Sequence, residues 1–133
     1  MIKRLLIVSL LLFLFKPGEL RAQLIADYLI KGADWRMCGS HQDKDTLRFF
    51  RYDAKVKGTQ CFQQTYTQLL TYSPNEFRIL NWTNGACNIN EPGTFEANDS
   101  NGTIRFYFDD GSSRDYLMLF LNKEKLVLVD LKY

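Results

Sequence analysis

The chain has 133 residues, of which 46% are hydrophobic and 14% aromatic, with 17 basic and 15 acidic side chains. This length fits one domain with a modest core. The formal net charge is only +2, and without a run of lysines and arginines it argues against a nucleic-acid-binding protein.

Residues 1–22 have the layout of a secretory signal peptide. Lys3 and Arg4 form a positive start, and Leu5 to Phe15 is apolar apart from one serine. This run of 11 residues is too short for a membrane-spanning helix, which needs about 20. The alternative is a short membrane anchor that stays attached.

Cleavage is expected after Ala22, which leaves a mature chain of residues 23–133. This part carries 13 basic and 14 acidic side chains, a net charge of −1, so the basic excess belongs to the leader. We expect a secreted or periplasmic protein with no membrane span after removal of the signal.

One or two helical turns are predicted at Leu24–Ile30, ended by Gly32. The pattern then changes to short strands separated by turn residues. Eight strands are predicted, at 34–38, 46–52, 60–72, 76–82, 88–97, 103–109, 114–122 and 125–131. A β-bulge is expected at Pro92-Gly93.

These elements predict an all-β fold, an antiparallel meander of about eight strands that closes into a small barrel, because closure removes exposed edges. Alternation places Ile104, Phe106 and Phe108 on the inner face. Tyr116 to Leu121 is apolar on both faces, so we expect the Leu24–Ile30 helix to cover one of them.

Four short motifs make the chain resemble the lipocalin or calycin superfamily. They are Gly32-Ala33-Asp34-Trp35 after a short helix, Phe50-Arg51-Tyr52-Asp53, Phe108-Asp109-Asp110-Gly111 and Leu126-Val127-Leu128. More closely, the chain resembles the small secreted lipocalin-like domains of bacteria, over most of residues 24–131. The resemblance implies a lipocalin-like β-barrel domain at 23–133.

Export favours a disulfide among Cys38, Cys61 and Cys87. In an up-and-down meander, Cys61 and Cys87 lie near the starts of the third and fifth strands and therefore at one end of the barrel. Cys38 then lies at the other end. We expect a Cys61–Cys87 bond, with Cys38 reduced or buried.

The residues do not predict catalysis. Cys38 and His41 are the only pair that resembles a nucleophile and its base, and nothing supplies an oxyanion hole. Cys38, His41 and Asp43 are too few and too mixed to predict a metal site. Adjacent carboxylates at Asp109-Asp110 lie in a turn, where they are usually solvated. We expect a non-enzymatic protein without a cofactor.

Two functions fit these expectations. In the first, the barrel is a carrier, and six inward-facing apolar side chains line a cavity for a small hydrophobic ligand. The alternative for these six side chains is that they simply fill the core. They are Phe49, Phe77, Phe106, Phe108, Tyr116 and Met118. In the second, a protein-binding module such as an exported inhibitor of a cell-wall-acting enzyme binds through loops 38–45 and 82–87.

A cavity measurement separates the two functions. An empty apolar pocket of roughly 300 Å³ or more favours the carrier. A filled interior with a protruding Trp82 favours the protein-binding module, because an exposed tryptophan often anchors an interface.

Overall fold

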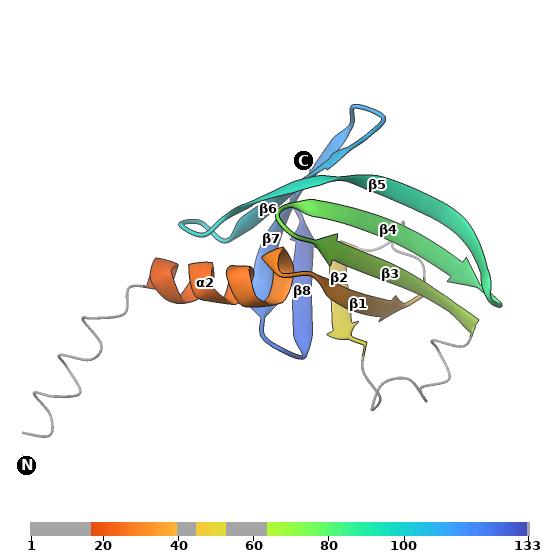
Figure 1. Ribbon diagram of the computed structural model, residues 1–133, viewed down its shortest axis with the longest axis horizontal. Helices are drawn as coiled ribbons and strands as arrows, with labels where there is room; N and C mark the ends of the chain where they lie inside the picture. Colours follow the sequence, from red (N-terminus) through yellow and green to blue (C-terminus); the bar gives the residue numbers. More distant parts are fainter. Residues whose placement is uncertain (1–16, 40–44, 53–63, 133) are drawn as a thin grey trace, which may run out of the picture.

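A computed structural model describes residues 17–39, 45–52 and 64–132. Figure 1 shows a short helix followed by strands that curve around a common interior. Helix α2 (Pro17–Ile25) continues directly into a π-helical turn, η1 (Ala26–Ile30). The predicted cleavage point after Ala22 lies within α2, and the apolar run Leu5–Phe15 lies outside the described residues.

Eight strands follow, with bounds close to those predicted. They are β1 (Ala33–Cys38), β2 (Thr46–Arg51), β3 (Thr65–Tyr72), β4 (Glu76–Thr83), β5 (Ala86–Asn98), β6 (Thr103–Phe108), β7 (Ser113–Leu121) and β8 (Lys125–Asp130). Within the described part of the chain, no helix combines the length and apolar character needed to cross a bilayer.

The strands form one closed barrel in the order β1-β2-β8-β7-β6-β5-β4-β3. Every neighbouring pair is antiparallel, and β2 pairs with β8 from Thr46 opposite Val129 to Phe50 opposite Lys125. The predicted fold class, a closed antiparallel barrel of eight strands behind a short helix, is therefore confirmed.

The strand order departs from a simple meander at one place. β1 lies between β2 and β3 and is antiparallel to both. β2 and β3 therefore run in the same direction, and β3 begins at the end of the barrel where β1 finishes, with Tyr66 opposite Cys38. The opposite direction was expected for β3, because consecutive strands are usually joined by a hairpin.

The longest strand, β5, pairs with β4 along its first part and with β6 along its second. Gly93 lies where the two pairings meet, opposite both Phe77 and Phe108. A Cβ atom on Gly93 would overlap the carbonyl oxygen of Tyr107 and lie 2.8 Å from Cε1 of Phe77. The missing side chain thus lets the Phe77 ring pack against the sheet.

The bulge expected at Pro92-Gly93 is wrong. The pairing of β4 with β5 continues without a break at that point, and its register shifts instead between Asn81 and Trp82. Glycine in a strand marks either a bulge or a close approach of other atoms. Here it marks the close approach of the Phe77 ring.

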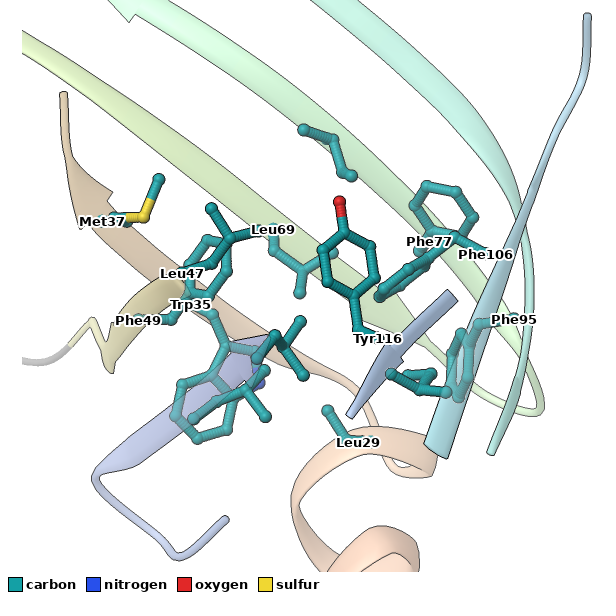
Figure 2. Close-up of a cluster of buried hydrophobic side chains, with 14 of the residues drawn as sticks. Leu29, Trp35, Met37, Leu47, Phe49, Leu69, Phe77, Phe95, Phe106 and Tyr116 are labelled. Atoms are coloured by element: carbon teal, nitrogen blue, oxygen red, sulfur yellow. The ribbon is translucent and has the colours of Figure 1, made fainter. Parts of the chain in front are cut away.

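The helix closes one end of the barrel. Ile25 and Leu29 belong to the same buried cluster as the inner side chains of the strands. Figure 2 shows Leu29 on its helical turn beside this cluster. Gly32, with φ of +98°, turns the chain from the helix into β1.

The helix was expected to cover one apolar face of β7, and it does so only in part. Met118 and Leu121 pack against the core, as expected for residues on the inner face. Leu119 and Phe120 remain 59% and 48% exposed. The helix lies across the end of the barrel and leaves these two side chains in contact with solvent.

Candidate functional site

The predicted ligand-lining side chains lie inside the barrel. Buried ones are Phe49, Phe77, Phe106, Phe108 and Tyr116, and Met118 is partly buried against them. Their inward direction follows from alternation along each strand, since the neighbouring positions on β6 and β4 are exposed.

Four of these rings pack against one another. The ring centroid of Phe106 lies 4.8 Å from that of Phe77 and 5.7 Å from that of Tyr116, both at steep angles. Phe77 also meets Phe108 edge to face at 5.3 Å. These are the geometries that aromatic pairs prefer. Figure 2 shows the rings of Phe77, Phe106 and Tyr116 close together inside the barrel.

Much of the core lies outside the six residues that were predicted to line a ligand cavity. Trp35 is fully buried, and Phe95 lies 6.5 Å from Phe106 between ring centroids. Further buried side chains are Met37, Leu47, Leu69, Ile79, Ile104, Leu126 and Leu128. The alternation of Trp35 with Met37, and of Leu126 with Leu128, is a signal that could have found them.

A hollow of about 210 Å³ opens between β5 and the turn that joins β6 to β7. Its lining combines Phe108 and Pro92 with the polar residues Asn90, Glu91, Asp109, Asp110, Ser112 and Arg114. The guanidinium carbon of Arg114 lies 5.6 Å from the centroid of the Phe108 ring. Burial raises the pKa of the neighbouring Tyr116, and Arg114 opposes that shift.

This hollow is smaller than the roughly 300 Å³ at which ligand pockets usually begin. Asp109 and Asp110 at its rim are exposed, and Asp110 accepts hydrogen bonds from Oγ and N of Ser112 at 2.6 and 2.8 Å. These bonds hold the pKa of Asp110 below its usual value. Among the described residues, no group of three histidine, cysteine or acidic side chains could hold a metal ion.

A second group of side chains lies on the outer face of the barrel. Here Arg36 on β1 stacks between Tyr52 and Tyr66, with its guanidinium carbon 3.4 and 5.0 Å from their ring centroids. The Tyr66 ring in turn stacks on Trp82, with centroids 6.2 Å apart and planes at 17°. We call Tyr52, Arg36, Tyr66 and Trp82 the outer ladder.

Hydrogen bonds to Asp34 and Gln68 fix the orientation of Arg36 and Trp82 in the outer ladder. Arg36 donates from Nε and Nη2 to the two carboxylate oxygens of Asp34, both at 3.1 Å. Gln68 donates to Asp34 at 3.1 Å and accepts from Nε1 of Trp82 at 2.9 Å. The bonds run without a break from β1 across β3 to β4, so the orientations of Arg36 and Trp82 are fixed together.

A protruding Trp82 was the feature expected to favour a protein-binding module, and Trp82 does not protrude. It lies half-buried on the outer face, with its ring against Tyr66 and its indole N–H bound to Gln68. The turn that follows is tight, with positive φ at Asn84 and Gly85. In the other predicted binding loop, His41 and Asp43 lie outside the described residues.

The predicted Cys61–Cys87 bond is wrong, because Cys87 is a free and exposed thiol. Cys61 lies outside the described residues. Cys87 is opposite Trp82, and Cys38 is opposite Tyr66, which itself pairs with Trp82. Cys38 and Cys87 therefore share one end of the barrel, and the prediction placed them at opposite ends because it assumed the wrong direction for β3.

No protein-family model, curated protein or solved structure matches this chain. The eight-strand antiparallel barrel is consistent with a lipocalin-like fold, and the likeness ends at that architecture. Any function must therefore be argued from the geometry of the barrel and its surfaces.

Proposed function

We propose that this protein is an exported, non-enzymatic binding module that uses its outer ladder to bind a protein partner. The observation that carries this proposal is the stack of Arg36, Tyr66 and Trp82, held on three strands by hydrogen bonds. Tryptophan, tyrosine and arginine are the residues that contribute most often to the binding energy of interfaces.

The rigidity of the outer ladder strengthens the proposal. A binding surface loses conformational entropy when its side chains become ordered on contact with a partner. Arg36 is bound to Asp34 through both Nε and Nη2, and its side chain is only 15% exposed. Trp82 is held by Gln68 and Tyr66. The outer ladder therefore loses little further side-chain entropy when a partner binds.

The packing of aromatic rings inside the barrel also supports a function on the outside. The rings around Phe106 occupy the space in which a carrier would hold its ligand. The barrel then acts as a scaffold that fixes the register of β1, β3 and β4, and so the spacing of the ladder. An exported inhibitor of a cell-wall-acting enzyme is one role of this kind.

The test is crosslinking in the compartment where the protein resides, with a photoreactive residue at the exposed position Asn84. We expect a discrete crosslinked partner. Trp82→Ala should weaken binding of that partner by about 30-fold, the loss of about 2 kcal/mol typical of a hot spot. Tyr107→Ala, at an exposed aromatic residue on β6, is the matched control and should leave binding unchanged.

Two results would contradict the proposal. One is the absence of any discrete partner while the protein is folded and exported. The other is equal binding by wild type and Trp82→Ala, with urea unfolding confirming that the variant retains its barrel.

Ligand binding at the mouth of the barrel is a second candidate, because Phe108 and Arg114 both line the hollow there. It would be a carrier function for a small hydrophobic ligand. Native mass spectrometry of the exported protein tests it. A stoichiometric small molecule that is lost in Phe108→Ala supports the carrier, and a bare chain mass rejects it.

A further inference from the structure

The outer face of β2, β8 and β7 carries apolar side chains where a barrel exposed to water usually carries polar ones. Phe120 on β7 lies opposite Val127 on β8, and Leu117 lies opposite Val129. Phe50 on β2 lies opposite Lys125 of β8 and is 39% exposed. We call Phe50, Leu117, Leu119, Phe120, Val127 and Val129 the apolar face.

The opposite pattern on β6 shows how unusual this face is. There Arg105 and Tyr107 point outward, and both have polar partners on neighbouring strands, Asp115 and Glu96. On β7 the register shifts between Met118 and Phe120, which leaves Leu119 more exposed than any other large apolar side chain of the described chain. Contiguous exposed apolar surface of this kind marks interaction sites.

Positive charges border the apolar face. Arg48 on β2 lies opposite Val127, and the ammonium group of Lys125 lies 5.8 Å from the ring centroid of Phe50. Lys123 is exposed in the turn between β7 and β8. In the part of the chain that the structure describes, no carboxylate pairs with any of these three cations. Apolar side chains surrounded by unpaired cations suit a negatively charged, apolar-cored surface.

The N-terminal chain approaches the same region. Leu20 and Arg21 on α2 line a hollow of about 300 Å³ together with the segment 118–121 of β7. Only four residues separate Leu20 from the end of the apolar run at Phe15. Even a fully extended chain spans at most about 17 Å over that distance. While residues 1–22 remain attached and the apolar run lies in a bilayer, Leu119 and Phe120 are therefore held near the membrane surface.

We propose that the apolar face docks on the surface of a bilayer containing anionic lipids. Phe120, Leu119 and Phe50 enter the interface between headgroups and acyl chains, and Arg48, Lys123 and Lys125 lie among the lipid phosphates. The two surfaces adjoin where Arg36 of the outer ladder lies opposite Phe50 of the apolar face. Trp82 lies on β4, which β3 and β1 separate from β2. The proposal rests on the apolar face and its cations, and the function proposed above rests on the outer ladder.

The test measures immersion at Leu119 in the full chain. In a Cys87→Ser background, Leu119→Cys is labelled without reductant with an environment-sensitive fluorophore and added to phosphatidylcholine–phosphatidylglycerol vesicles. Emission should move to shorter wavelength and be quenched by spin-labelled lipid. Tyr107→Cys, labelled in the same way on the outer face of β6, should continue to report water. The parent carrying only Cys87→Ser measures background labelling.

The charges are tested in the same assay. Lys123→Glu combined with Lys125→Glu should reduce the quenching at position 119, and Lys31→Glu, on a side chain that is 72% exposed at the end of the helix, should not. Trp82→Ala should leave the quenching unchanged, which separates this proposal from the outer ladder.

Four outcomes would overturn the proposal. The label at 119 could continue to report water on vesicle-bound protein, or the chain could fail to bind the vesicles at all. Equal immersion at 107 and 119 would show that the barrel has no preferred orientation. A shift that rises with protein concentration in the absence of vesicles would show that a second copy covers the face.

Discussion

Phe106 should be the most costly single side chain to truncate. It is 1% exposed, and its ring contacts those of Phe77, Phe95 and Tyr116. Phe106→Ala should therefore lower the free energy of unfolding by about 3–5 kcal/mol, a large share of the 5–15 kcal/mol typical of a domain. Urea unfolding measures this loss.

Arg105→Ala is the control from the adjacent position. Its side chain faces solvent and pairs with Asp115, which is also exposed, so the pair is screened by water. It should cost far less than Phe106→Ala. The reverse order of the two losses would contradict the assignment of inner and outer faces.

Tyr116 should make the barrel sensitive to alkali. Burial raises its pKa above the ordinary value of 10.0, so above about pH 10 the unfolded chain releases a proton that the folded chain retains. Stability is therefore complete below that pH and falls as the pH rises toward the folded pKa. Urea unfolding from about pH 9 to about pH 11 should show this decline, and Tyr116→Phe should flatten it. An equally steep decline in the variant would assign the effect to other tyrosines.

Cys87 should react with iodoacetamide in the native protein without reductant, because it is free and exposed. Peptide mapping under non-reducing conditions should recover an alkylated Cys87 peptide. With Cys87 free, any disulfide within one chain can join only the two other cysteines, Cys38 and Cys61. Recovery of Cys87 in a disulfide-linked peptide would contradict its assignment as a free thiol.

At the scale of the strands, Gly93→Ala should be disproportionately destabilising. The added methyl group would overlap the backbone of β6 at Tyr107 and press on the Phe77 ring, so the pairing of β5 with β6 must shift. Overpacking of this kind costs about 1–3 kcal/mol, which a thermal or urea melt detects. Thr94→Ala, at the exposed neighbouring position, should change stability by less than about 0.5 kcal/mol.

The strands themselves could be predicted from sequence because alternation and turn residues are local signals. Ile104, Phe106 and Phe108 point inward as their spacing indicates. The position of β1 between β2 and β3 could not be predicted, because it depends on which strand edges pair across the whole chain. The disulfide prediction depended on that order and was wrong for the same reason.

Of the candidate sites, the inner residues could be predicted from the sequence, and the outer ladder could not. Inner residues such as Phe77 follow from period two along one strand. The outer ladder depends on three registers at once, since Arg36, Tyr66 and Trp82 come from different strands. Trp82 was singled out in the sequence, but its partners could be recognised only after the pairing of β1 with β3 and of β3 with β4 was known.

For the whole molecule, the seam between β2 and β8 should be essential. A chain that ends at Asn122 lacks β8 and leaves both β2 and β7 with unpaired edges. Such edges are templates for association with other chains. We expect the truncated protein to aggregate, as measured by light scattering, where full-length protein stays dispersed. A monomeric truncated chain would show that the seam is dispensable.

The pairing of β2 with β8 also determines when the barrel can close. Thr46 meets Val129, so a strand made early in synthesis must wait for the last strand to be made before its free edge is covered. Contacts between such distant parts of a chain form late and slow the folding of β proteins. A chain threaded through a membrane from its N-terminus would emerge with β2 unprotected throughout its passage. Newly made chains must therefore be kept from associating through the exposed edge of β2 until β8 is available to pair with it.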